Sequence, residues 1–425
     1  KDVPPQTIGQ QLGVAHVLNG SVRKQGIKLR ISAALIRTSD GVQQWSKQYD
    51  GDIADVFDLQ DSCARDIAAE LDSALAGEQV RLVDKATENP EAYAKFIEAQ
   101  QLVTRRFGDS LPRAVVLLND ALKLDPQFSR AWAKLAVAHA VVVQYAGGDW
   151  NENWALAEKA ANRAIALDPR SSEASATIGY INLSRRRYLD MDKPAQRALE
   201  LDPDDITSNF WLANQYASMG RMRDAERLVA HALQRDPANP LVMFYMGNLK
   251  WLQGDYQGAR MVSEAAAALG HPLAKLTLAY DLGRRGEVAA GAKYFATAMT
   301  ALGTRIPAAD IETVFKAGTG SSAERARAVA TLDRHLDDEY TPTFLLMAHQ
   351  PERSFALFER NQSGLSDAYY DWLWQTEDWS REARQHPAFQ GFAKRIGLVD
   401  YWKQNRWPDL CSPTPENGPD AFQCR

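Results

Sequence analysis

The side chains that could carry out chemistry in this chain do not form a catalytic pattern. Its seven histidines include no His-Glu-x-x-His sequence and no pair four positions apart, the spacings that put two ligands of one zinc ion on a helix face. The glycine-rich stretch 318–322 lacks the lysine of a phosphate-binding loop. No Gly-x-Ser-x-Gly nucleophile elbow occurs. We therefore expect no catalytic residues, no metal site and no cofactor.

Two asparagines offer hydrogen-bonding chemistry at a regular spacing. Asn214 and Asn248 lie 34 positions apart, and each follows a phenylalanine, Phe210 or Phe244, by four positions. An amide side chain both donates and accepts, so this pair could hold the backbone of an extended peptide without reading its side chains. The phenylalanines would add apolar contact. These four residues are our candidates for peptide binding, and the alternative is that the polar pair only lines an open surface.

Two cysteines lie close together near the end of the sequence. Cys411 and Cys424 bracket a short segment that contains proline and glycine and has little else to order it. A disulfide between them would close a loop of roughly 14 residues and contribute on the order of 3 kcal/mol. Such a bond would imply an oxidising compartment. The alternative is a pair of free thiols in a cytosolic tail.

Asp-Pro pairs recur through the middle of the chain at nearly fixed intervals. The pairs are Asp125-Pro126, Asp168-Pro169, Asp202-Pro203 and Asp236-Pro237, and Pro272, Pro307 and Pro342 continue the series. The prolines are 43, 34, 34, 35, 35 and 35 positions apart. A period near 34 predicts an array of helix pairs, which acts by offering surface. Each proline would end one helix and preset the start of the next.

The repeats that end at Pro237 and Pro272 carry a recognisable residue pattern. The first contains Trp211, Leu212, Ala213, Tyr216, Gly220, Ala225 and Ala232, and the second contains Met246, Gly247, Gly254, Tyr256, Ala259 and Ala266. This pattern resembles tetratricopeptide repeats, strongly over these two units and weakly after Pro272. The resemblance implies a mainly α, right-handed helical solenoid. Its first helices would face a concave groove, with Asn214 and Asn248 pointing inward.

One repeat is longer than the others. The unit that ends at Pro169 has nine extra residues, which we assign to the segment 144–154. Insertions into repeats map to loops that often lie on a binding face, so Tyr145, Trp150 and Trp154 could contact a partner. The alternative is a lengthened helix pair that packs its own aromatic residues.

A different kind of segment precedes the repeats. Strand-like runs at 15–24, 28–37 and 43–49 follow a short helix over 6–13 and precede an amphipathic helix over 55–76. The motifs are Leu12-Gly13-Val14, Leu18-Asn19-Gly20-Ser21-Val22-Arg23, Leu29-Arg30-Ile31-Ser32-Ala33, Trp45-Ser46, Tyr49-Asp50 and Asp55-Val56-Phe57-Asp58-Leu59-Gln60. They resemble the second half of the TolB-like module that precedes tetratricopeptide arrays in bacterial regulators of the CadC type and in class III adenylate cyclases. The strand, helix and strand that open that family's module have no counterpart here.

The sequence therefore predicts four segments. A truncated α/β module occupies 1–76, a linker 77–90, helical repeats 91–386, and an aromatic-rich C-terminal cap 387–425. Five of the 11 tryptophans, at positions 372, 374, 379, 402 and 407, fall in the last 54 residues. Such a cluster can cover the last exposed apolar face of a solenoid. An aromatic ligand cage is the alternative.

Composition limits the partners. The net charge is −5 and no run of five Lys or Arg occurs, so we expect no nucleic acid to bind this region. We expect a protein or peptide partner, a membrane contact only through an upstream span, and leave a homodimer open. The favoured hypothesis is the non-catalytic sensory region of a periplasmic, inner-membrane-anchored regulator or cyclase. A free periplasmic scaffold, a cytoplasmic location, and an enzyme with its site between the α/β module and the first repeats are the alternatives.

Overall fold

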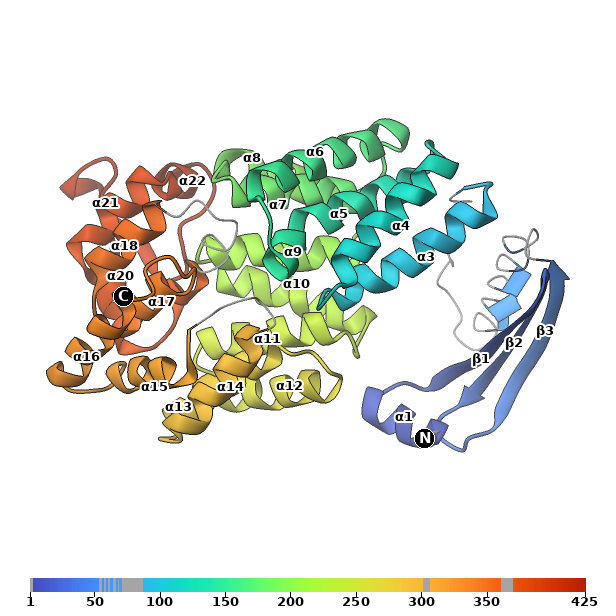
Figure 1. Ribbon diagram of the computed structural model, residues 1–425, viewed down its shortest axis with the longest axis horizontal. Coiled ribbons are helices and arrows are strands. Elements are labelled where there is room, and N and C mark those ends of the chain that lie inside the picture. Colours follow the sequence, from blue (N-terminus) through green and yellow to red (C-terminus); the bar gives the residue numbers. More distant parts are fainter. Residues whose placement is uncertain are drawn as a thin grey trace. The chain divides into compact units, whose positions relative to one another are not determined.

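A computed structural model describes residues 3–52, 87–300, 306–360 and 370–425, together with a few helical positions between 56 and 70. The chain divides into two compact units, residues 1–97 with 120–128 and residues 98–119 with 129–425 (Figure 1). The expected linker 77–90 lies outside the described residues except for its last four positions. The fold is mainly α, a tetratricopeptide-type helical solenoid preceded by a small α/β module, as the sequence predicts.

The α/β module is a three-stranded antiparallel meander close to the predicted ranges. Helix α1 (Pro5–Leu12) ends at Gly13, which has a left-handed φ of 66°, and strands β1 (His16–Gln25), β2 (Lys28–Arg37) and β3 (Gln43–Asp52) follow. Strand β2 lies between the other two. Leu29 and Leu35, which lie on one face of β2, are buried. The alternation of apolar and polar residues that predicted the strand therefore marks its buried face.

Antiparallel helix pairs make up the array. The elements are α3 (Pro90–Arg105), α4 (Ser110–Leu124), α5 (Ser129–Ala146), α6 (Trp150–Leu167), α7 (Ser172–Ser184), α8 (Tyr188–Leu201), α9 (Ile206–Ser218), α10 (Met222–Arg235), α11 (Pro240–Leu252), α12 (Tyr256–Ala268), α13 (Ala274–Arg284) and α14 (Val288–Thr300). Fully buried alanines at Ala213, Ala225 and Ala232 let α9 and α10 approach closely. The nine extra residues of the long repeat lengthen α5 and α6 to 18 residues each.

The Asp-Pro pairs act as turns rather than as helix starts. The Asp168 carboxylate accepts a hydrogen bond from the backbone N–H of Arg170 at 2.9 Å, and Asp202 makes the same contact one repeat later at 3.1 Å. This closes an Asx turn around the proline. Helix α7 begins three positions after Pro169. For the Asp-Pro pairs the expectation that the proline presets the next helix was therefore wrong, because a turn separates the proline from the helix start. Pro342 does lie in the first turn of its helix, Thr341–Met347, as expected.

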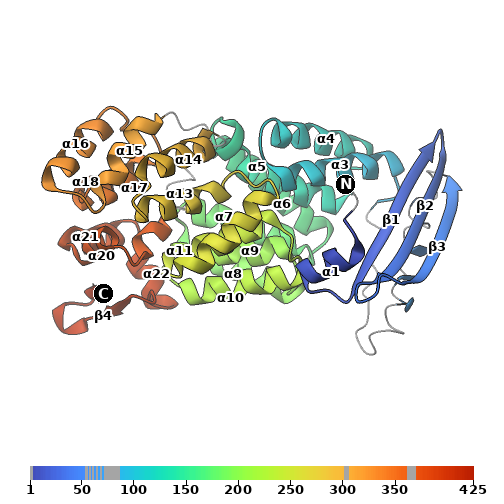
Figure 2. The same ribbon diagram turned by 90° about the horizontal axis from the view of Figure 1, so that it is seen from below.

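The C-terminal part of the chain continues with shorter elements. These are α15 (Ala308–Ala317), α16 (Ser322–Leu332), α17 (Thr341–Met347), α18 (Pro351–Arg360), η2 (Tyr370–Trp374), α20 (Asp378–Gln385), α21 (Pro387–Arg395), α22 (Leu398–Gln404), β4 (Cys411–Pro413), η3 (Pro415–Asn417) and β5 (Phe422–Cys424). They fold back onto earlier repeats. Element η2 contacts α9 and α11. Helix α22 contacts α8 (Figure 2).

Three consecutive carbonyl groups at the end of α9 receive hydrogen bonds from this C-terminal part. The indole N–H of Trp374 donates to Ser218, that of Trp402 donates to Met219, and the backbone N–H of Asp409 donates to Gly220, at 3.2, 3.2 and 2.9 Å. The last carbonyls of a helix have no partner within the helix. The C-terminal part therefore supplies hydrogen-bond donors to buried carbonyls that have no partner within α9.

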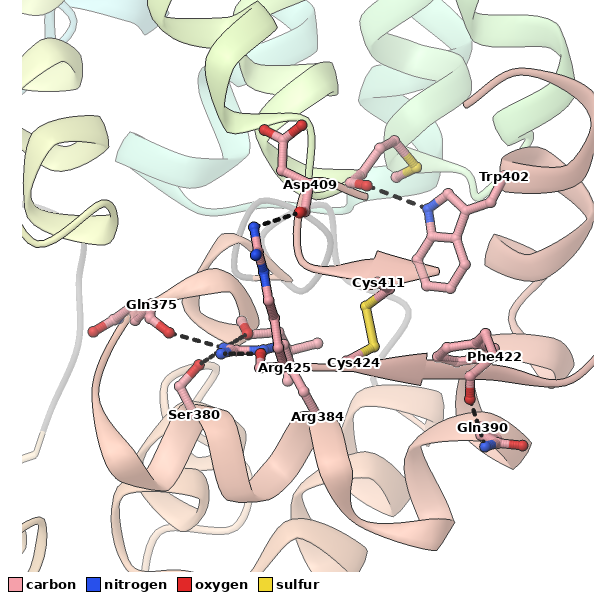
Figure 3. Close-up of a disulfide and its surroundings, with 12 residues drawn as sticks. Gln375, Ser380, Arg384, Gln390, Trp402, Asp409, Cys411, Phe422, Cys424 and Arg425 are labelled. Carbon is pink, nitrogen blue, oxygen red and sulfur yellow. Dashed lines mark hydrogen bonds between the residues drawn. A yellow bond between two sulfur atoms is a disulfide. The ribbon is translucent and has the colours of Figure 1, made fainter. Parts of the chain in front are cut away.

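A disulfide ties the end of this segment together (Figure 3). Cys411 of β4 and Cys424 of β5 are bonded, and they face each other in a two-stranded antiparallel sheet. Beneath the sheet, the buried Arg384 guanidinium donates to the backbone oxygens of Gln375 and Arg425 at 2.8 and 3.0 Å. Its burial lowers the pKa of Arg384 to about 10. The charged group is held because the backbone oxygens around it accept its N–H groups.

Replacement of Gly220 by alanine should loosen the contact between α9 and the C-terminal part. Gly220 has φ +79°, and an added Cβ would lie 2.6 Å from Cβ of Pro408. Gly286, at φ +87°, has no neighbour within 4 Å of an added Cβ and is the matched control for backbone strain alone. We expect Gly220→Ala to lower the melting temperature more than Gly286→Ala and to speed proteolysis near residue 408. Equal effects of the two substitutions would contradict this contact.

Candidate functional site

A cavity of about 130 Å³ lies on the inner side of the array. First helices of five successive pairs line it, namely α5, α7, α9, α11 and α13, together with Arg106, Tyr340 and residues of η2. The lining side chains are Arg106, Val141, Gln144, Tyr145, Tyr180, Phe210, Trp211, Asn214, Leu241, Phe244, Tyr245, Asn248, Leu273, Leu276, Tyr280, Tyr340, Asp371 and Trp372. Half of these side chains are aromatic, so the cavity suits an apolar group.

All four candidate peptide-binding residues line this one cavity. Phe210 and Asn214 come from α9, and Phe244 and Asn248 come from the matching positions of α11. Each of the four side chains is half-buried. Because the repeat places equivalent residues on neighbouring first helices, a spacing of 34 positions in the sequence becomes one continuous wall.

The two asparagines have different partners. The Nδ2 group of Asn214 donates to the Tyr245 hydroxyl at 3.3 Å, and its Oδ1 atom is buried without a hydrogen-bond partner in the described part of the chain. Asn248 donates from Nδ2 to Oδ2 of Asp371 at 3.0 Å. The amide of Asn248 is therefore already bonded to the Asp371 carboxyl, whereas Oδ1 of Asn214 could accept a hydrogen bond from a ligand.

Asp371 brings a carboxyl group into the cavity from 123 positions away in the sequence. Its residue is only 5% exposed, and burial raises the pKa of the Asp371 carboxyl to about 7, against the hydrogen bond from Asn248, which favours the charged form. Its Oδ1 atom is also buried without a hydrogen-bond partner among the described residues. Near neutral pH this group can therefore exist in either protonation state.

Aromatic rings pack against one another around the cavity. Phe210 contacts the ring of Tyr245 with centroids 5.2 Å apart, and Phe244 stacks on His271 at 5.1 Å. At the other end Tyr280 meets Trp372 of η2 at 4.5 Å. Such contacts hold each ring in one orientation and make the wall rigid. The cavity is thus formed before any ligand arrives.

Arg106 is a lining residue that the sequence analysis missed. It follows the end of α3 with a left-handed φ of 61°, which is uncommon for a residue other than glycine, and it is 8% exposed. Its Cζ atom lies 5.8 Å from the ring centroid of Phe210. An arginine at a helix end usually points into solvent, so no sequence pattern distinguished Arg106 from the exposed Arg105 beside it.

The residues assigned to the insertion have separate positions. Tyr145 lies at the end of α5, lines the cavity and packs against Phe107 at 5.2 Å. Trp150 and Trp154 belong to α6, pack on each other at 5.4 Å, and do not line the cavity. Trp154 is only 2% exposed. Of the three candidates, Tyr145 is the one placed beside the asparagine pair.

Other kinds of site find no support among the residues that the structure describes. In that part of the chain no group of three or more His, Cys, Asp or Glu side chains could hold a metal ion. None of the described helices combines the length and the apolar character that crossing a bilayer requires. We base the functional hypothesis below on the cavity lined by Asn214 and Asn248.

Substitution of Asp371 by asparagine should change how stability depends on pH. Folding raises the pKa of this carboxyl, so the folded protein favours its neutral form. The free energy of unfolding therefore falls as pH rises from about 4 toward 7. Asparagine is neutral throughout and keeps an oxygen for Asn248. We expect the melting temperature of Asp371→Asn to exceed that of the wild type by more at pH 8 than at pH 5. The exposed Asp337→Asn is the control, and a pH-independent difference for Asp371→Asn would contradict the shift.

Comparison with known proteins gives a partial match. No family model matches the chain. A relative described as "Putative adenylate cyclase 3", from Rhizobium meliloti (strain 1021), is 31% identical over 185 residues. The match covers 43% of this chain and 31% of the relative, so the chain spans less than a third of that protein's length.

Several solved structures have a similar arrangement of helices. A chain of the Cut9–Hcn1 complex of the APC/C is 12% identical, with a TM-score of 0.48. The match covers 78% of this chain and 58% of that chain. Yeast Tom70 is 13% identical over 82% of this chain and 75% of its own, with a TM-score of 0.37. PilW, described as a type IV pilus biogenesis factor, is 21% identical over 50% of this chain and 94% of its own, with a TM-score of 0.35.

Proposed function

We propose that this chain is the non-catalytic, ligand-binding region of a larger bacterial signalling protein. Its ligand is a short peptide segment or a small organic signal that enters the cavity between α9 and α11. Phe210 and Phe244 would contact apolar parts of the ligand, and Asn214 would accept a hydrogen bond from it. Binding would be passed to an output domain, of the transcription-regulator or adenylate cyclase type, elsewhere in the full protein.

One observation carries this proposal. Asn214 and Asn248, with a phenylalanine one helical turn before each, line the same aromatic cavity, and Oδ1 of Asn214 has no partner among the described residues. A buried polar atom without a partner costs free energy that a well-placed ligand N–H would recover. Pockets that bind small ligands typically combine apolar walls with a few polar groups of this kind.

Two further facts support the signalling context. The sequence relative is named as a putative adenylate cyclase, and this chain matches only part of it, which fits a regulatory region beside a separate catalytic one. The disulfide between Cys411 and Cys424 fits an oxidising compartment, for which we propose the periplasm. A free periplasmic scaffold would also explain the disulfide, but it would not explain the similarity to a putative adenylate cyclase.

Ligand selection on the purified chain tests the proposed site. We would incubate it with a mixture of randomised hexapeptides and a panel of small organic compounds and identify retained molecules by mass spectrometry. Retained ligands should bind Asn214→Ala and Phe210→Ala at least tenfold more weakly, because each change removes a hydrogen bond or an apolar contact of about 1–2 kcal/mol.

The control is Asn119→Ala. Asn119 is exposed on α4, and its Nδ2 group donates to the Val115 carbonyl in its own helix at 2.8 Å. Its replacement should leave affinity unchanged. Retention of no ligand at all, or equal affinity of the Asn214 and Phe210 variants and the wild type, would refute the proposed site.

Cysteine labelling tests the compartment. In protein expressed with export to the periplasm, alkylation in denaturant without reductant should label Cys63 alone, because Cys411 and Cys424 are bonded to each other. After reduction all three cysteines should react. Three labels per chain without reductant in the exported protein would remove the argument for an oxidising location.

A further inference from the structure

Arg106 is a buried cation without a counter-ion in the described part of the chain. Its residue is 92% buried, it lines the cavity, and its Nε atom has no hydrogen-bond partner there. No ion pair joins its guanidinium to a carboxylate of the described residues. Burial of an unpaired charge is costly, and proteins normally offset that cost with a partner of opposite sign.

The Arg106 guanidinium lies beside aromatic rings. The Phe210 ring lies 5.8 Å from its Cζ atom, and the ring of the adjacent Phe107 contacts Tyr145 and His271 edge to face, at 5.2 and 5.4 Å. Burial, together with the positive charge of Arg106, lowers the pKa of His271 to about 4. This end of the cavity is therefore positive at neutral pH, with apolar walls.

The backbone also holds Arg106 in an unfavourable conformation. Its φ of 61° lies in the left-handed region, which residues other than glycine and asparagine seldom occupy. Gly108, two positions later, has a similar φ of 66° and adopts it without that steric cost. A strained, unpaired and buried arginine is hard to explain by stability alone, and such residues cluster at binding sites.

The chain itself limits how long a ligand can be. Asp371 and Trp372 of η2 also line the cavity, and Asp371 accepts the hydrogen bond of Asn248. An extended peptide cannot run along the inner helices past Asn248 without displacing η2. A cavity of about 130 Å³ nevertheless far exceeds the roughly 10–15 Å³ that one water molecule needs.

We propose that Arg106 binds the carboxylate of a small organic acid whose apolar, preferably aromatic, body fills the cavity. The proposal rests on the ligand-binding function proposed above and names the chemical class of the ligand. The planar guanidinium can donate two parallel hydrogen bonds to one carboxylate, which fixes the acid group in position. The body of the acid would lie between Phe210 and Phe244 and reach toward Asn214.

Matched series of small compounds test the charge requirement. The probes are phenylacetate, phenylpropionate and indoleacetate, each compared with the amide and the amine of the same carbon skeleton. Binding to the purified chain is followed by tryptophan fluorescence, because Trp211 and Trp372 line the cavity, and by ligand-observed NMR. We expect saturable binding of at least one acid, with its amide and amine bound at least tenfold more weakly.

Variants assign the effect to Arg106. Arg106→Gln should weaken binding of the acid at least tenfold, and Arg106→Lys should be intermediate because it keeps the charge but loses the two-pronged geometry. Arg105→Gln, an exposed arginine one position earlier, is the matched control and should bind as the wild type does. The melting temperature of Arg106→Gln should change little, since the arginine has no carboxylate partner to lose among the described residues and its ring contact with Phe210 is long.

Each other outcome overturns the inference. Equal binding of acid and amide, tighter binding of the amine, binding of no acid, or unchanged binding to Arg106→Gln would show that Arg106 does not hold a carboxylate. A clear loss of stability in Arg106→Gln would assign the residue a structural role instead. If the selected ligands of the preceding section still bind at Asn214 and Phe210, the proposed function survives this failure. If neither they nor the acids bind, both proposals fail.

Discussion

The contact between the C-terminal part of the chain and the end of α9 fixes the position of η2, which lines the candidate site. Three successive carbonyls, of Ser218, Met219 and Gly220, accept hydrogen bonds from Trp374, Trp402 and Asp409. The two tryptophans are almost fully buried, and burial of such large rings supplies a driving force of several kcal/mol. Directional bonds to the carbonyls then fix where the rings lie. The C-terminal part is thereby anchored on the middle helices of the array.

This contact also shapes the candidate site. Because Trp374 is fixed on α9, the preceding residues of η2 lie over the inner helices, where Asp371 meets Asn248 and Trp372 meets Tyr280. Residues of η2 thereby form part of the cavity wall. Its polar atoms without partners in the described residues, on Asn214, Asp371 and Arg106, then favour a compact amphiphilic ligand over a long one.

The sequence predicted the helix pairs, the three strands and the disulfide, and it missed contacts between segments that lie far apart in the chain. Helix pairs recur at a fixed interval and strand residues alternate between apolar and polar, so a single sequence reveals both. The inward positions of Asn214 and Asn248 followed from the resemblance to tetratricopeptide repeats. Arg106 could not be found, since an arginine after a helix carries no mark of burial. Asp371 could not be linked to Asn248, because the two are 123 positions apart and nothing periodic connects them. The prediction was also wrong for helix starts after Asp-Pro pairs, because α7 and α9 begin three positions after Pro169 and Pro203.

Helices α8 and α9 are covered by residues that follow them much later in the sequence, and this affects the chain during its synthesis. Trp374 bonds to a carbonyl 156 positions earlier, and the Tyr401 hydroxyl donates to the buried Asp192 across 209 positions. During translation the middle helices emerge long before these partners exist, so their apolar flank stays open while the remaining chain is made. A chain that ends before Trp374 and Tyr401 would therefore lack the groups that cover this part of α8 and α9.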